Sequence, residues 1–237
     1  MYRRVDRQAD KYKNLSNSSK RKGFTLAEIL LTLTIIGIIA SYTIPALTNT
    51  IKGKETTVQV QKIYSIMGQA FISLESDNGG DISPTFTDKN KFQVLTSFAT
   101  KLNIIKNCGT DPGCFPDVIY LYLNKTEYAN VNQDTASAKA IISDGMSVAF
   151  FTYSNCTTDR TASADQNSPL YNTCGKFLVD INGSKGPNII GRDWFYFWIT
   201  KRQLYPGGAY PDNMASNCTT NGLGCASKII LEGNMNY

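Results

Sequence analysis

Histidine is absent from this chain of 237 residues. Its absence removes the commonest general base of enzymes and the commonest nitrogen ligand of metal ions. The sequence also contains no C-x-x-C pair of the kind that binds zinc and no G-x-x-x-x-G-K-[S/T] loop of the kind that cradles nucleotide phosphates. A hydrolase without histidine would need a Ser–Lys or carboxylate arrangement, and no motif supports one. We therefore expect a protein that is not an enzyme.

The chain has a formal net charge of +5, and this excess of positive charge is confined to the N-terminus. Residues 1–23 contain eight Lys or Arg and two Asp, whereas residues 24–237 contain 16 Lys or Arg and 17 Asp or Glu. The chain beyond the first 23 residues is therefore almost neutral. A nucleic-acid-binding surface needs clustered positive charge, so we expect no nucleic-acid partner.

No cysteine precedes residue 108, and the six that follow form three sequence-local pairs. An even number of cysteines in loops rich in Asn, Thr and Gly indicates disulfides, and hence an oxidising compartment outside the cytoplasm. Free buried thiols are the alternative, and nearest-neighbour pairing is one of several possible connectivities. The expected pairs are Cys108 with Cys114, Cys156 with Cys174, and Cys218 with Cys225.

One apolar run has no charged residue between Glu28 and Lys52, which makes it long enough to span a membrane as a helix. Lys and Arg precede it, so the positive-inside rule places the N-terminus in the cytoplasm and residues 53–237 outside. A secretory signal peptide, cleaved near Ser41, is the competing interpretation. Two features oppose it: the apolar run continues beyond Ser41, and Glu28 places a carboxylate near the hydrocarbon layer, where a charge is costly and indicates function.

Residues 22–30, KGFTLAEIL, resemble the cleavage signal of type IV prepilins and type II secretion pseudopilins. The resemblance implies a membrane peptidase that cuts between Gly23 and Phe24 and then methylates the new amino group of Phe24. It also implies that Glu28 pairs with the N-terminal amine of a neighbouring subunit, which would offset the cost of burying both charges. Pro45 corresponds to the proline that kinks the helix of this family, because proline removes a backbone hydrogen bond.

The resemblance implies an α+β, pilin-like fold, in which a long N-terminal helix, half of it transmembrane, packs on an antiparallel β-sheet with disulfide-tethered loops. We expect three parts: a cleaved basic leader over 1–23, a transmembrane and assembly helix over 24–77, and a globular extracytoplasmic head over 78–237. An apolar stripe that starts at Val58 and ends at Leu74 continues the helix beyond the membrane, and Gly79 and Gly80 end it.

Weaker patterns predict the elements of the head. A second helix is expected over 89–106, capped by Thr87 or Asp88. Strands are expected over 118–123, 140–142, 146–153, 176–181 and 194–200, with a hairpin turn at Asp144-Gly145. The aromatic run 194–198 is expected to bury one face and to leave the other for subunit contacts. The cysteine-bearing segments 106–117, 154–175 and 202–227 are expected to be loops.

Residues 180–193 read D-x-N-G-x-x-G-P-N-x-x-G-x-D, which resembles a stretch of bacterial pilin-like proteins. Oxygen-bearing side chains alternate at 180, 182 and 184, as in part of a calcium loop. The stretch departs from the EF-hand, because Lys185 stands where Gly belongs and Gly191 where a bidentate Glu belongs. Since pseudopilins often carry calcium in a C-terminal loop, calcium is the candidate cofactor. Its candidate ligands are Asp180, Asn182, Asn188 and Asp193; the alternative is a pair of Asx turns without metal.

The combined features favour a structural subunit of a type II secretion pseudopilus, polymerised from the bacterial inner membrane after processing by prepilin peptidase. The implied partners are further copies, other pilin-like subunits, the peptidase, an inner-membrane assembly platform and membrane lipid. The alternative is a pilin of a type IV pilus, used in adhesion, motility or DNA uptake. The stretch 180–193 favours the pseudopilus, whereas a terminal Cys218/Cys225 loop is also common in pilins.

Overall fold

The computed structural model describes residues 23–161, 165–212 and 217–237. The chain divides into two units, one up to Thr48 and a compact unit from Asn49 to Tyr237. Helix α1 (Leu26–Asp77) begins in the first unit and continues into the second, which holds every other described element. The leader expected over 1–23 lies outside the described residues, apart from Gly23.

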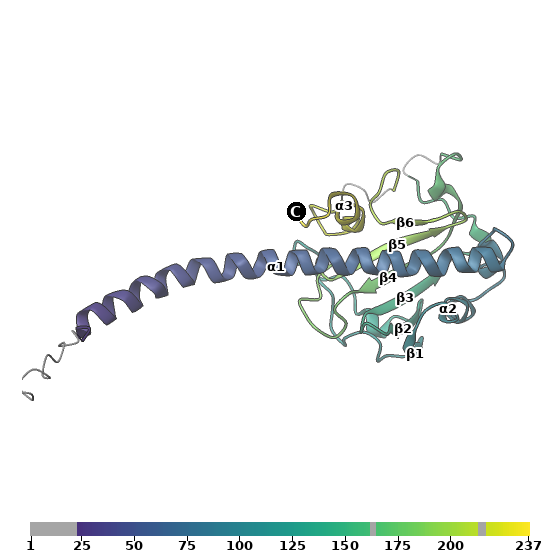
Figure 1. Cartoon of the computed structure of the whole chain (residues 1–237). Helices are drawn as coiled ribbons and strands as arrows, with labels where there is room; N and C mark the ends of the chain where they lie inside the picture. The colour runs from purple at the N-terminus through teal and green to yellow at the C-terminus, as the bar shows by residue number, and fades with distance from the viewer. Residues whose placement is uncertain (1–22, 162–164, 213–216) are drawn as a thin grey trace, which may run out of the picture. The chain divides into compact units, whose positions relative to one another are not determined.

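The sheet of the compact unit has six strands in sequence order, and each strand pairs antiparallel with the next (Figure 1). The strands are β1 (Ile104–Gly109), β2 (Ala138–Ile142), β3 (Ser147–Thr152), β4 (Thr173–Asp180), β5 (Trp194–Thr200) and β6 (Leu204–Pro206). Two shorter helices, α2 (Lys91–Ala99) and α3 (Cys225–Glu232), complete the unit. The expected α+β, pilin-like layout is confirmed.

One face of the sheet packs against α1 and α2. Phe177 of β4 and Phe197 of β5 stack with ring centroids 4.8 Å apart, and Phe197 also stacks on Tyr64 of α1 at 5.7 Å. Phe98 of α2 meets Phe150 of β3 at 5.0 Å. Aromatic rings bury large apolar areas, so this layer supplies much of the stability of the compact unit.

The opposite face of the sheet is covered by the chain's own loops. Every residue of β5 is buried, and the outward Trp194, Tyr196 and Trp198 lie in a second apolar cluster. Tyr128, from the long β1–β2 connection, packs edge-on against Trp194 at 5.5 Å. The expectation that one face of this strand is left for subunit contacts is therefore wrong, because these loops are long enough to cover it.

Several boundaries differ from expectation for local reasons. Helix α2 starts at Lys91 rather than at 89, because Asn90 and Gln93 form a reciprocal capping box. It ends at Ala99, and residues 104–109 leave the helix to pair with β2. Residues 118–123, expected to be a strand, do not form one, and Leu121 makes only isolated bridges. The expected loop over 202–227 contains β6 and the start of α3.

Three disulfides close loops within the compact unit: Cys108–Cys114, Cys156–Cys174 and Cys218–Cys225. Each joins cysteines that neighbour one another in the sequence, with separations of 6, 18 and 7 residues. Such crosslinks stabilise mainly by restricting the unfolded chain. They therefore close short local loops, at β1, at β4 and at the start of α3, rather than joining distant segments.

The two edges of the sheet are poor templates for another strand. The register of β1 against β2 is interrupted twice, between Ile104 and Lys106 and again between Asn107 and Gly109. At the other edge, β6 has only three residues and ends in Pro206, which has no backbone N–H to donate. Short, irregular or proline-bearing edges resist pairing with other chains.

Candidate functional site

The peptide bond between Gly23 and Phe24 lies just before α1 in exposed, non-helical chain. The Phe24 side chain is 83% exposed. No described heavy atom lies within 4 Å of the position that a Cβ at Gly23 would occupy, and the backbone there is not left-handed. The fold of the chain itself therefore does not require glycine at this position. A requirement for glycine would have to come from a molecule that binds the segment.

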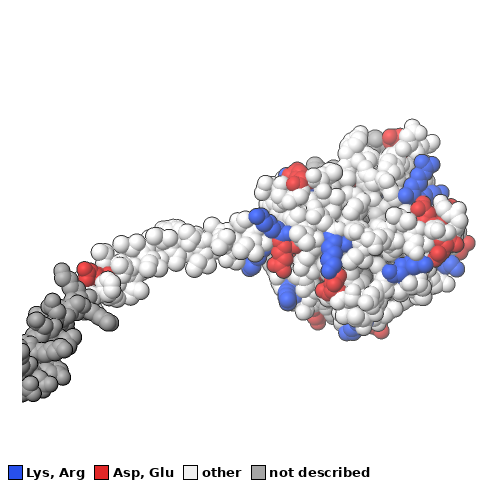
Figure 2. All heavy atoms as spheres, in the orientation of Figure 1, with Lys and Arg blue, Asp and Glu red and all other residues white. Residues whose placement is uncertain are grey.

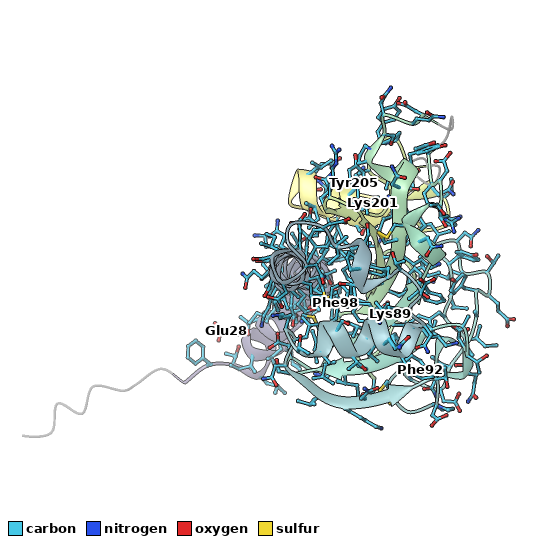
Figure 3. All side chains as sticks on the ribbon, turned by 90° about the vertical axis from the view of Figure 1, so that its right-hand side faces the viewer. Glu28, Lys89, Phe92, Phe98, Lys201 and Tyr205 are labelled. Carbon is cyan, nitrogen blue, oxygen red and sulfur yellow. A yellow bond between two sulfur atoms is a disulfide. The ribbon has the colours of Figure 1, made fainter. Side chains whose placement is uncertain are left out.

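Glu28 is held by its own helix one turn after Phe24 (Figure 3). The Thr25 backbone N–H donates to Glu28 Oε2 at 2.7 Å, and the Thr25 hydroxyl donates to the same oxygen at 2.9 Å. The Glu28 N–H donates to Thr25 Oγ1 at 3.2 Å, which completes a capping box. The carboxylate is thus hydrogen-bonded on one side but forms no salt bridge with a cationic side chain among the described residues. That leaves it available for a positive charge from outside the chain.

Apolar side chains cover the helix after Glu28 and remain exposed. By length and composition α1 can cross a membrane, and none of its most apolar stretch is buried in the protein. The long uncharged segment is the white stretch in Figure 2 between the red group near the start of α1 and the first blue groups. Pro45 lies inside the helix. An exposed apolar surface of this extent requires lipid or another protein to cover it.

The stretch 180–193 forms the connection from β4 to β5 and contains two buried carboxylates. Asp180 is fully buried and Asp193 is 2% exposed. The Tyr120 hydroxyl donates to Asp180, and the Asn182 N–H donates to Asp180 Oδ1 at 3.1 Å. Asp193 accepts from the N–H groups of Asn188 at 2.6 Å and Ile189 at 2.7 Å. Buried carboxylates are rare unless they are paired, and here only neutral groups are seen to pair them.

Oxygen atoms converge on the side chain of Asn182. In the amide orientation that satisfies both groups, Asn182 Nδ2 donates to the Lys185 carbonyl oxygen at 2.6 Å and to Asp180 Oδ1 at 3.0 Å. Nearby, the buried Asn188 Oδ1 has no hydrogen-bond donor. The four predicted ligands thus lie in one loop, where hydrogen bonds within the chain already satisfy several of their polar atoms.

Electrostatics in this loop favour an added positive charge. The pKa of Asp180 is raised from 3.8 to about 7: burial and the charge of Asp193 raise it, and these outweigh the lowering by the hydrogen bonds from Tyr120 and from backbone N–H groups. Burial also raises the pKa of Asp193. Among the described residues, no group of three or more His, Cys, Asp or Glu is arranged to hold a metal. A cation here would therefore depend on two carboxylates together with amide and carbonyl oxygens.

Two buried tyrosine–carboxylate contacts escaped the sequence analysis. Tyr120 is 60 residues from Asp180, so no local pattern connects them. Asp212, 3% exposed, accepts from the Tyr196 hydroxyl at 2.9 Å, from Trp198 Nε1 at 2.8 Å and from the Gly208 N–H at 2.7 Å. Both contacts join sheet residues to loops, and neither lies near the N-terminal motif in the sequence.

These parts fit a membrane-anchored subunit: an exposed apolar helix, a carboxylate in its first turn, an accessible bond before it, and a disulfide-bearing α+β unit. Residues 18–43 match the family model of the prokaryotic N-terminal methylation motif. That motif is the signal of type IV prepilins and pseudopilins, so the resemblance of residues 22–30 is confirmed. The chain matched no curated protein and no solved structure. The motif and the fold together are those of a type IV pilin-like or pseudopilin subunit.

Proposed function

We propose that this chain is the precursor of a subunit of a type II secretion pseudopilus, held in the inner membrane by α1 and polymerised from there. One observation carries the proposal: a lone carboxylate, Glu28, stands at the start of an uncovered apolar helix directly after an accessible Gly23–Phe24 bond. The stretch 180–193 supports the pseudopilus over a type IV pilus, which is the alternative assembly.

The proposed role is mechanical. Cleavage after Gly23 removes the basic leader and creates a positive amine at Phe24, four residues from Glu28. Charges near the hydrocarbon layer are costly when single, and a carboxylate from one copy and an amine from the next offset each other. The apolar side chains of α1 then exchange lipid for neighbouring helices. Since the sequence has no phosphate-binding loop, the energy for extraction comes from a separate protein.

Intact-mass and N-terminal analysis of the protein from membranes of its native host tests the processing step. We expect a chain that starts at N-methylated Phe24 and carries the three disulfides. The Gly23→Leu chain should retain the leader, because the fold leaves room for leucine at this position and only the peptidase would reject it. A mature N-terminus near residue 42, or mature-sized protein from Gly23→Leu, would contradict the proposal.

We also propose that calcium binds the 180–193 loop, through the side chains of Asp180, Asn182, Asn188 and Asp193. The bound ion would supply positive charge to two buried carboxylates. Because folding raises the pKa of Asp180, the folded state without an ion binds a proton that the unfolded chain has released. Its stability therefore falls as the pH rises from about 4 to about 7.

Chelation is therefore expected to lower the melting temperature, and more so at pH 7.5 than at pH 5.5. Saturating calcium at a hundred times Kd should stabilise the fold by about 2.7 kcal/mol. Differential scanning fluorimetry with EDTA and with added calcium measures the shift. The Asp193→Asn chain should lose the calcium response, whereas Asp81→Asn, at an exposed position, should keep it. If neither EDTA nor calcium changes the melting temperature of the unaltered chain, the calcium site is excluded.

A further inference from the structure

A second feature of the compact unit is a cleft of about 1150 Å³ beside the first turns of α1 that belong to it. One wall is the α1 segment 52–59, and the other combines the β2–β3 turn with the loop after β4. The lining includes Lys52, Gly53 and Glu55 from α1, and Lys185 and Gly186 from the loop.

The position of the cleft along the chain is set by the apolar run. Lys52 is the first charged residue after Glu28, and Ile51 directly precedes it. A helix rises about 1.5 Å per residue, so the wall from Lys52 to Gln59 spans roughly the first 12 Å beyond the apolar run. The polar headgroup layer of a bilayer is about 5–8 Å thick on each side. This wall therefore begins at the depth of lipid headgroups.

Three of the six charged groups that line the cleft already have partners within the compact unit. Asp144 pairs with Lys62 at 3.0 Å, and an Arg192 guanidinium N–H donates to the Tyr237 carbonyl at 3.1 Å. Asp193 accepts the backbone N–H groups described above. None of the salt bridges among the described residues involves Lys52, Glu55 or Lys185. Two ammonium groups and one carboxylate, all on exposed residues, thus remain for a ligand that carries both signs of charge.

Glycine keeps the helix wall of the cleft open. Gly53 lies inside α1, where glycine costs about 1 kcal/mol relative to alanine. No described heavy atom lies within 4 Å of a Cβ built there, so packing within the chain does not demand glycine. Gly186 on the facing loop has only the Asn188 amide nitrogen near its Cβ position, at 3.9 Å. The open space at both glycines is part of the cleft that a ligand would fill.

We propose that this cleft binds the headgroup of a glycerophospholipid, with its phosphate at Lys52 and Lys185 and the amine of an ethanolamine headgroup at Glu55. Charge complementarity and the depth of the cleft both favour this occupant. The proposal rests on the membrane location of α1 but not on cleavage or polymerisation, so it can be tested on the full-length chain.

Native mass spectrometry of the full chain in detergent, titrated with phosphatidylethanolamine, measures the binding. The unaltered chain is expected to bind one lipid in a saturable manner. Gly53→Leu fills the cleft, and Lys52→Gln with Lys185→Gln removes the cations. Each should weaken binding at least about tenfold, the equivalent of losing one charge-assisted hydrogen bond. Gly68→Leu is the matched control, because Gly68 also lies in α1, also has open space at its Cβ position and does not line this cleft.

Headgroup selectivity completes the test. Glu55→Gln should abolish a preference for phosphatidylethanolamine over phosphatidylglycerol, since only the former carries an amine. Equal lipid binding by the unaltered chain, Gly53→Leu and the double lysine variant would overturn the proposal. Saturation of the same site by inorganic phosphate, with no gain from a lipid, would overturn the lipid assignment. Failed cleavage at Gly23 would instead count against the proposed function and leave the lipid measurement intact.

Discussion

Filaments are expected to be nearly absent from cells that produce the Glu28→Ala chain, although the leader is still removed. The substitution leaves the Gly23–Phe24 bond exposed and the apolar side chains of the helix unchanged, and the Thr25 hydroxyl can still cap the helix through the backbone N–H of residue 28. It deletes the carboxylate that would neutralise the amine of the next subunit. Charge-assisted hydrogen bonds contribute about 1.5–3 kcal/mol, so losing one at each subunit contact should reduce assembly at least tenfold. Immunoblots of sheared filaments and of membranes, with N-terminal mass analysis, give the assembled fraction and the processing state.

The control for this experiment lies on the same helix. Glu75→Ala removes a carboxylate near the far end of α1, within the compact unit, and should assemble normally. Filaments in normal amounts from Glu28→Ala would refute the pairing role. Uncleaved Glu28→Ala precursor would show instead that the carboxylate is needed by the peptidase.

Replacement of Phe197 by alanine should cost the most stability of any substitution considered. The ring is fully buried between Phe177 and Tyr64, so it joins the centre of the sheet to α1. Deleting a buried phenylalanine removes its transfer free energy and leaves a cavity, a loss of about 3–5 kcal/mol. Urea unfolding of the full chain in detergent, followed by near-ultraviolet circular dichroism, measures the change.

Phe92→Ala provides the comparison, because it makes the same chemical change at a ring that is 43% exposed. In Figure 3 Phe98 lies on the inner side of α2 and Phe92 on its outer side. We expect Phe92→Ala to cost about 1 kcal/mol or less, the range for substitutions away from the core. Similar losses from both substitutions would mean that the aromatic layer between sheet and helix does not dominate stability.

The sequence predicts the long helix well because its signals are strong and local. The apolar run and the apolar stripe after it predict one long helix, and Gly79 and Gly80 predict where it ends. The helix observed has nearly the same bounds. Within the stripe, Ile63, Met67 and Leu74 are buried as expected, but Val58 is 62% exposed. Periodicity alone cannot distinguish a core position from one at the margin of the buried face. Strand β5 follows its predicted bounds because branched and aromatic residues fill it without interruption.

The head is less predictable where long-range contacts decide the outcome. Ile104 and Ile105 fit the apolar face of a helix, but pairing with β2 draws them into β1. The N-terminal part of the candidate site, Gly23, Phe24 and Glu28, is predicted directly from the sequence because the motif is contiguous. The environment of Asp180 could not, since Tyr120 and Asp193 reach it from separate segments. Burial of these carboxylates appears only once the chain is folded.

The irregular edge strands of the sheet, β1 and β6, limit the ways in which one subunit could pair with the next in a filament. In a filament, identical compact units sit at very high local concentration, the condition under which an open strand would recruit its neighbour. The register breaks in β1 and the proline that ends β6 leave no regular edge strand with which a neighbour could pair. Polymerisation by strand exchange, which would give a fibre as stable as a cross-β fibre, is therefore disfavoured. In the proposed filament, the choice of neighbour would then depend on the N-terminal helix, whose exposed apolar side chains can pack either against lipid or against other helices.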